Sequence, residues 1–184
     1  MFQSHLLFKS SVLILFLTIL ISCNTNQTHT TTIDLNAPTS DSLKEAMINN
    51  NRAGMQQEAN AITIYVKKRG WNMNTSGTGL RYEIYHEGAG KSFPKKGDFA
   101  TVAYTLSLLD GTMISNVTTI NPEIFQIGKA SVPRGLEEGI TFMKAGDKAH
   151  LVLPKHLAFG LVGDDKKIPS NSILCYDVEL VSVK

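Results

Sequence analysis

Three segments of the sequence decide the fold. They read KGDFATVAYTLSLLDG at residues 96–111, VPRGLEEGITFMKAGDKAHLVLPKHLAFG at 132–160 and IPSNSILCYDVELVSV at 168–183. In the first segment, apolar side chains occupy every second position from Val102 to Leu108, which is typical of a strand. This strand is predicted to end in a hairpin turn at Asp110-Gly111, because glycine readily adopts the positive φ that a tight turn needs.

The middle segment predicts a short helix between strands. Leu136, Ile140 and Met143 are spaced by four and three residues, so they share one face of a helix that Pro133 opens and Gly146 stops. Alternating strand patterns occur at 80–84, 149–153 and 174–180. The fold class is therefore α+β, with an antiparallel β-sheet wrapped around one short α-helix. We expect this domain to occupy residues 72–184.

The order and spacing of short motifs resemble the FKBP family of peptidyl-prolyl cis-trans isomerases. The motifs that carry the resemblance are Gly97-Asp98, Tyr104, Asp110-Gly111, Gly128, Arg134-Gly135-Leu136-Glu137-Glu138-Gly139, Met143, Gly146, Pro154, Ala158-Phe159-Gly160, Ile168-Pro169 and Asp177-Val178-Glu179-Leu180. The resemblance implies an FKBP-like fold and an isomerase that acts on proline-containing polypeptide clients. Rotation about an X-Pro bond needs no nucleophile, so we expect no cofactor and no metal.

The family pattern also implies a pocket of aromatic and aliphatic side chains. Three residues match its catalytic aromatic positions: Tyr104, Phe159 and Tyr176. The expected substrate-binding residues are Ile114, Ser115, Phe125, Val132, Pro133, Leu136 and Ile168. For Tyr104, Phe125 and Tyr176, the alternative is a role confined to the core of the sheet.

Five residues depart from the family pattern. Ile114-Ser115 stands where a Phe-Asp pair is usual, and Leu136 replaces a tryptophan floor. Phe159 lacks the hydroxyl of the usual tyrosine, and Pro133 has no backbone N–H to donate to a bound peptide. These losses keep a second function open, namely a catalytically weak or inactive FKBP-like chaperone or binding module.

The N-terminus predicts export and a lipid anchor. Residues 1–22 contain Lys9 and an apolar core from Val12 to Ile21, the composition of a signal peptide. Ser22 before Cys23 resembles a lipoprotein processing site, which implies lipid on Cys23 and attachment to a membrane of a bacterial cell envelope, facing the periplasm. A net charge of +2 gives no reason to expect nucleic acid.

Residues 23–40 are rich in Asn, Thr and Ser and are expected to form a flexible tether. Apolar residues at three- and four-residue steps predict an N-terminal helix over 41–70, which either pairs two copies of the chain or docks onto its own domain. The length, the lipid site, this helix and the segment Arg69-Gly70-Trp71, which leads into Thr78-Gly79-Leu80-Arg81-Tyr82, together resemble the gliding-motility-associated FKBP-type lipoproteins of Bacteroidetes. That resemblance implies clients in the gliding and secretion machinery.

Overall fold

The computed structural model of the protein describes residues 40–184. The predicted signal peptide 1–22, the lipid site Cys23 and the tether up to residue 39 lie outside the described residues. The chain divides into two units, Met1–Lys44 and Glu45–Lys184, and the strands described within residues 40–184 belong to the second. Within residues 40–184, no helix has both the length and the apolar character needed to cross a membrane.

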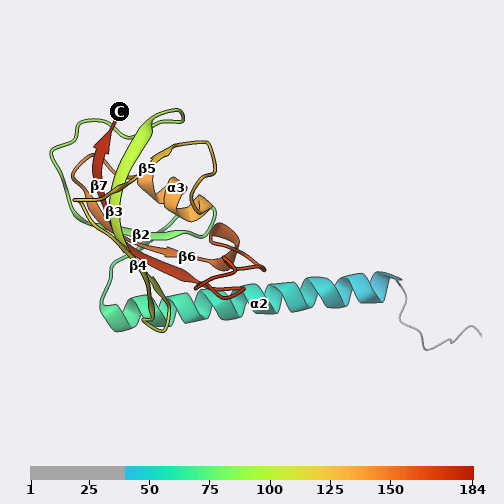
Figure 1. The fold of residues 1–184 in the computed structure, drawn as a ribbon. Coiled ribbons are helices and arrows are strands. Elements are labelled where there is room, and N and C mark those ends of the chain that lie inside the picture. Colours follow the sequence, from blue (N-terminus) through green and yellow to red (C-terminus); the bar gives the residue numbers. More distant parts are fainter. Residues whose placement is uncertain (1–39) are drawn as a thin grey trace, which may run out of the picture. The chain divides into compact units, whose positions relative to one another are not determined.

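An antiparallel sheet of seven strands forms the second unit (Figure 1). The strands are β1 (Asn74–Thr75), β2 (Arg81–His86), β3 (Phe99–Leu108), β4 (Met113–Val117), β5 (Glu123–Gln126), β6 (Lys148–Leu153) and β7 (Leu174–Val183). Their order is β1-β2-β6-β7-β3-β4, and β5 pairs with β3 beside this path. The predicted α+β class is confirmed.

The predicted hairpin at Asp110-Gly111 joins β3 to β4. Gly111 has a φ of 94°, and its N–H donates to Leu108 O, while Thr112 N–H donates to the Asp110 carboxylate at 2.8 Å. Strands β4 and β5 carry no clear alternation in the sequence, and the sequence pattern did not predict them. Both pair with β3, which lies between them and β7.

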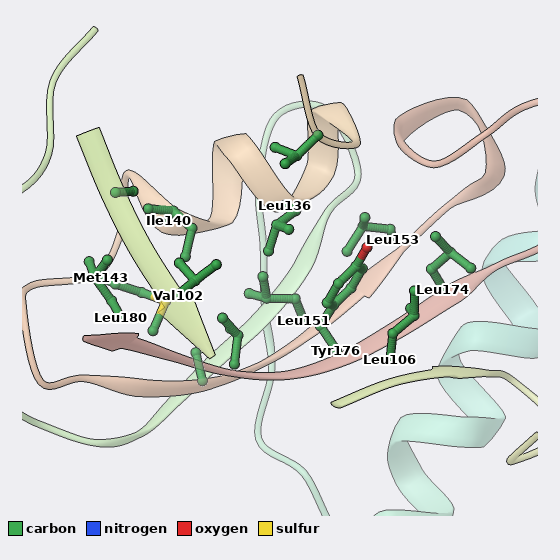
Figure 2. Packing of buried hydrophobic residues seen from close by; sticks show 14 of the residues in the cluster. Val102, Leu106, Leu136, Ile140, Met143, Leu151, Leu153, Leu174, Tyr176 and Leu180 are labelled. Atoms are coloured by element: carbon green, nitrogen blue, oxygen red, sulfur yellow. The ribbon is translucent and has the colours of Figure 1, made fainter. Parts of the chain in front are cut away.

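Helix α3 (Arg134–Ile140) lies across one face of the sheet (Figure 1). Its Leu136 and Ile140 point toward the strands and are fully buried with Val102, Leu151 and other strand residues (Figure 2). The core therefore sits between α3 and the sheet.

The predicted extension of this helix to Gly146 is wrong. After Ile140, the N–H groups of Thr141, Phe142 and Met143 reach back three residues instead of four, so the helix tightens into a turn. The side chain of Asp147 then accepts the N–H of Lys144 at 2.8 Å. Met143 is still fully buried, because this turn keeps it under the sheet.

Helix α2 (Ser40–Arg69) docks with its C-terminal part on the opposite face of the sheet. Ile62 is buried with Val152 and Cys175, whose neighbours in β6 and β7 face the main core. The carboxylate of Glu58 also accepts the N–H of Lys155 at 2.7 Å. The sequence left two roles open for this helix, pairing two copies of the chain or docking onto its own domain. These contacts show that it docks onto its own domain.

Candidate functional site

A cleft of about 320 Å³ opens between α3, the strands β3, β4 and β5, and the loop that follows β6. It is lined by nine of the ten pocket residues predicted from the sequence. These are Tyr104, Ile114, Ser115, Val132, Pro133, Leu136, Phe159, Ile168 and Tyr176. The tenth, Phe125, is not among the lining residues.

The floor of the cleft is apolar and rigid. Leu136 is 1% exposed and Tyr176 is 3% exposed, so both belong to the core and to the cleft. The Tyr104 and Tyr176 rings pack edge to face, with centroids 5.2 Å apart. Leu136, Tyr104 and Tyr176 therefore belong both to the pocket and to the core, because the cleft opens onto the core.

One wall of the cleft carries a carboxylate. Tyr104 donates its hydroxyl to Glu123 Oε2 at 2.6 Å. Burial and this bond to a carboxylate raise the pKa of Tyr104, so the phenol stays protonated and holds Glu123 in place. Burial also raises the pKa of Tyr176. Tyr104 and Tyr176 therefore line the cleft as neutral phenols.

Glu123 is a cleft residue that the sequence interpretation missed. In β5, Glu123 pairs with Val102 and Phe125 with Ala100, so both side chains project from the inner face of the sheet. Phe125 is 4% exposed and lies deeper in the core, whereas Glu123 reaches the cleft. A usable signal was present: a glutamate two residues before Phe125 must share its face of the strand.

The position of Glu123 changes the account of Ser115. The family pattern has an aspartate at this position, so by sequence the site lacks one polar group. The structure shows that a carboxylate enters the cleft from β5, beside Tyr104. Position 115 in the sequence gives no sign of this carboxylate. β4 pairs with residues 104–107 of β3 and β5 pairs with residues 99–102, so only strand pairing brings β4 and β5 to the same cleft.

The far wall is a loop organised by Asp164. Its Oδ1 accepts the backbone N–H groups of Ile168, Lys167 and Lys166 at 2.7, 2.8 and 2.9 Å. These hydrogen bonds hold the pKa of Asp164 below its usual range. The Lys167 Nζ reaches across to donate to Ile114 O at 3.5 Å. This contact joins the loop to β4.

Two donors expected of the family are absent at the cleft. Pro133 lines it with a φ of −53° and no N–H. Phe159 is 37% exposed and offers only a ring. A peptide in this cleft would make apolar contacts on the floor and few hydrogen bonds to these two positions.

Other openings lack this convergence of residues. A cleft of about 610 Å³ runs along α2 and is lined mainly by Ile64, Tyr65, Lys68 and Arg69. It contains none of the ten predicted residues. Across residues 40–184, no three His, Cys, Asp or Glu side chains gather in a way that suits a metal ion.

The cleft suits a rotation about a peptide bond better than a bond-breaking reaction. A planar X-Pro amide is more dipolar than the twisted amide at the top of the barrier, so a dry apolar site favours the twisted form. A proline ring is apolar and would bury its surface on Leu136.

Comparisons with known proteins cover the same part of the chain. A family model for FKBP-type peptidyl-prolyl cis-trans isomerase matches residues 90–181. FK506-binding protein 1A of Aspergillus fumigatus is 40% identical over 106 residues, which are 57% of this chain and 95% of that protein. Peptidyl-prolyl cis-trans isomerase FKBP1A of Xenopus laevis is 38% identical over 107 residues, 58% of this chain and 99% of that protein. The crystal structure of FkpA from Escherichia coli superimposes with a TM-score of 0.60 at 31% identity, covering 79% of this chain and 73% of that one.

Proposed function

The chain belongs to the FKBP-type peptidyl-prolyl cis-trans isomerase family, and from this premise we propose that it serves as a membrane-anchored folding factor for secreted or envelope proteins. It acts on proline-containing polypeptides. The observation that carries the proposal is the apolar cleft over Leu136, walled by Tyr104 and Tyr176.

Catalysis would come from the environment of the bond. Uncatalysed rotation crosses a barrier of about 18–20 kcal/mol. The cleft replaces water around the X-Pro amide with the side chains of Leu136, Ile168 and Tyr176, all nearly fully buried. The rigid floor also holds the proline ring while the preceding carbonyl turns.

We expect a slower enzyme than a family member with a full set of donors. Pro133 and Phe159 each remove one hydrogen bond to the peptide, and each is worth about 0.5–1.5 kcal/mol. If both bonds strengthen in the transition state, their loss lowers kcat/KM by about fivefold to hundredfold.

A protease-free assay tests the activity. The full chain in detergent is mixed with tetrapeptides that contain one proline, and the cis–trans exchange rate is followed by NMR. We expect an accelerated exchange that Leu136→Asp abolishes and that Ile64→Ala, on the exposed side of α2, leaves unchanged. A folded protein with no acceleration would contradict an enzymatic role.

A binding role without appreciable catalysis is the second candidate, and the missing donors at Pro133 and Phe159 favour it. An apolar cleft still buries a proline ring when these bonds are absent. In that case client proteins would bind with no change in their isomerisation rate. If Tyr104→Ala left client binding intact, the cleft would have no part in that binding.

The anchoring part of the proposal rests on Cys23 and on the apolar run before it. Two or more acyl chains on one N-terminus are enough for stable attachment to a membrane. Mass spectrometry of the N-terminal peptide from the native host should find acylated Cys23, and Cys23→Ser should release the protein from membranes. An uncleaved N-terminus would contradict this anchor. We propose that the domain lies in the periplasm. A membrane-impermeant protease added to intact cells tests this location, because a periplasmic domain should resist cleavage.

The client proposal is that the chain supports the folding of gliding and secretion components, as in the lipoproteins that it resembles. The chain length and the motifs within residues 1–82 are the features behind this proposal. A deletion strain should lose motility and contain less of those components. Normal motility with normal component levels would contradict it.

We also propose that α2 pairs two copies of the chain. Met47 and Met55 are each 66% exposed, and Ile48 is 47% exposed, so an apolar surface remains on the helix after its C-terminal part has docked. Light scattering of the purified protein should then give the mass of a dimer, and Met47→Lys should give a monomer. A monomer at all concentrations would rule out this pairing.

A further inference from the structure

We propose that Glu123 makes the cleft select prolyl peptides by charge, so that lysine or arginine next to the proline is preferred over aspartate or glutamate. This selectivity goes beyond isomerisation itself. It rests on four charged side chains that line the cleft: Glu123, Asp164, Lys166 and Lys167.

Glu123 has the capacity to bind a cation. Its Oε2 accepts the Tyr104 hydroxyl, whereas no hydrogen bond within residues 40–184 reaches its Oε1. No lysine or arginine of the described chain forms an ion pair with it. An ionised carboxylate accepts about four hydrogen bonds, so Glu123 enters the cleft with most of this capacity unused.

Asp164, the second carboxylate at the cleft, is bound to its own loop. Its Oδ1 is surrounded by three backbone N–H groups, those of Lys166, Lys167 and Ile168. The carboxylate thus acts as a structural acceptor for its own loop. Of the two carboxylates at the cleft, Asp164 is bound by the backbone of Lys166 and Lys167, whereas Glu123 has no cationic neighbour of this kind within residues 40–184.

The two lysines would favour the opposite charge, so their strength relative to Glu123 decides the preference. Lys166 and Lys167 are exposed at the rim, and Lys167 directs its Nζ toward Ile114 O. Exposed charges are screened by water and salt. Glu123 is half-buried against Tyr104, where a lower local dielectric strengthens its attraction for a cation. The negative charge therefore prevails at the part of the cleft nearest the proline.

The position of Glu123 in the cleft indicates which residue of a bound peptide its carboxylate contacts. The proline ring belongs over Leu136 on the apolar floor, and Glu123 stands on the β5 wall beside this floor. A side chain directly before or after the proline is the part of the peptide that reaches a wall. Both positions are varied in the test.

The experiment compares kcat/KM for tetrapeptides that carry Lys, Gln or Glu immediately before proline, and for a second series varied immediately after it. At low ionic strength we expect about a threefold to tenfold preference for Lys over Glu in one series. The preference should fall below about twofold at 0.5 M salt, where the Debye length is a few ångströms.

Variants identify the source of the preference. Glu123→Gln keeps an acceptor for the Tyr104 hydroxyl but removes the charge, so the ratio of kcat/KM for the Lys peptide to kcat/KM for the Glu peptide should approach one. Glu87→Gln is the matched control, because Glu87 is exposed after β2, outside the cleft, and the same net charge is lost. An unchanged ratio in Glu123→Gln, or a ratio of one in the unmodified protein at low salt, would overturn the proposal. A preference for Glu peptides would show that the lysines dominate and would overturn it as well. The measurements on the unmodified protein decide the point even if Glu123→Gln does not fold.

Discussion

Replacing Gly135 by alanine should destabilise the domain, although alanine is the better helix former. Gly135 lies in α3 on the face that packs against β6. A Cβ at this position would come within 2.4 Å of Leu153 Cγ, 2.8 Å of Leu153 Cδ2 and 3.1 Å of Leu157 Cβ. Real contacts are longer than 3.0 Å, so the helix or Leu153 must move. Leu153 is fully buried, which leaves it little room.

The magnitude is the difference between two effects. Alanine in place of glycine in a helix stabilises by about 1 kcal/mol. Overpacking of a filled core costs about 1–3 kcal/mol. The blocking atom is the branch carbon of Leu153, not the flexible end of a side chain, so the upper half of that range applies. We expect Gly135→Ala to lower the free energy of unfolding by about 1–2 kcal/mol.

Gly54 provides a control of opposite sign. It lies inside α2, and a Cβ there would meet no atom within 4 Å. Gly54→Ala should therefore raise stability by up to about 1 kcal/mol. Urea unfolding followed by far-UV circular dichroism measures both variants. Equal or greater stability of Gly135→Ala relative to the unmodified protein would refute the close-packing argument.

Four further outcomes follow from the site and its surroundings. Tyr104→Phe should lower the free energy of unfolding by about 0.5–1.5 kcal/mol in urea titrations, because Glu123 loses its phenol donor; no change would mean that this bond is not formed. Asp164→Ala should loosen the loop wall and lower kcat/KM severalfold in the exchange assay, and a fully active variant would speak against a role for that loop. Burial lowers the pKa of His150 below its ordinary 6.5, and Asp177, Glu83 and Arg69 are the charged groups around it. Below pH 6.5 the unfolded chain therefore binds a proton at His150 that the folded chain does not bind. The free energy of unfolding should be largest above pH 6.5 and fall below it. Chemical denaturation from pH 7.5 to 5.5 should show this slope and His150→Gln should flatten it. Burial raises the pKa of Cys175 to about 11; peptide-resolved alkylation at pH 8 should be slow until urea is added, and rapid alkylation of the native protein would contradict its burial.

His150 shows what an alternating strand pattern predicts and what it does not predict. The alternation at 149–153 correctly separates Ala149, Leu151 and Leu153 from His150 and Val152, because successive side chains of a strand face opposite sides. The pattern does not reveal what covers the second face. In the structure the His150 ring stacks on Trp71 with centroids 4.0 Å apart and on Tyr85 at 4.3 Å. The chain segment that reaches this face comes from the end of α2.

The short strands and the helix end were harder to predict for local reasons. Residues 113–117 and 123–126 are too short to display a period, and β5 is a strand mainly because β3 supplies its hydrogen-bond partners. The spacing of Leu136, Ile140 and Met143 fits a longer helix, yet Met143 is buried from a turn. A tight turn and a helix can place side chains on the same face, so spacing alone does not distinguish them.

By itself, the sequence determined the α+β class, the hairpin at Asp110-Gly111 and the buried faces of the main strands, since these depend on periods of two and four residues and on glycine. Only the tertiary structure decided the composition of the cleft. Tyr104 and Glu123 are nineteen positions apart and meet at 2.6 Å because β3 pairs with β5 in one particular register. Local patterns carry no information about such a register, and a pairing one residue away would have turned Glu123 to the opposite face of the sheet.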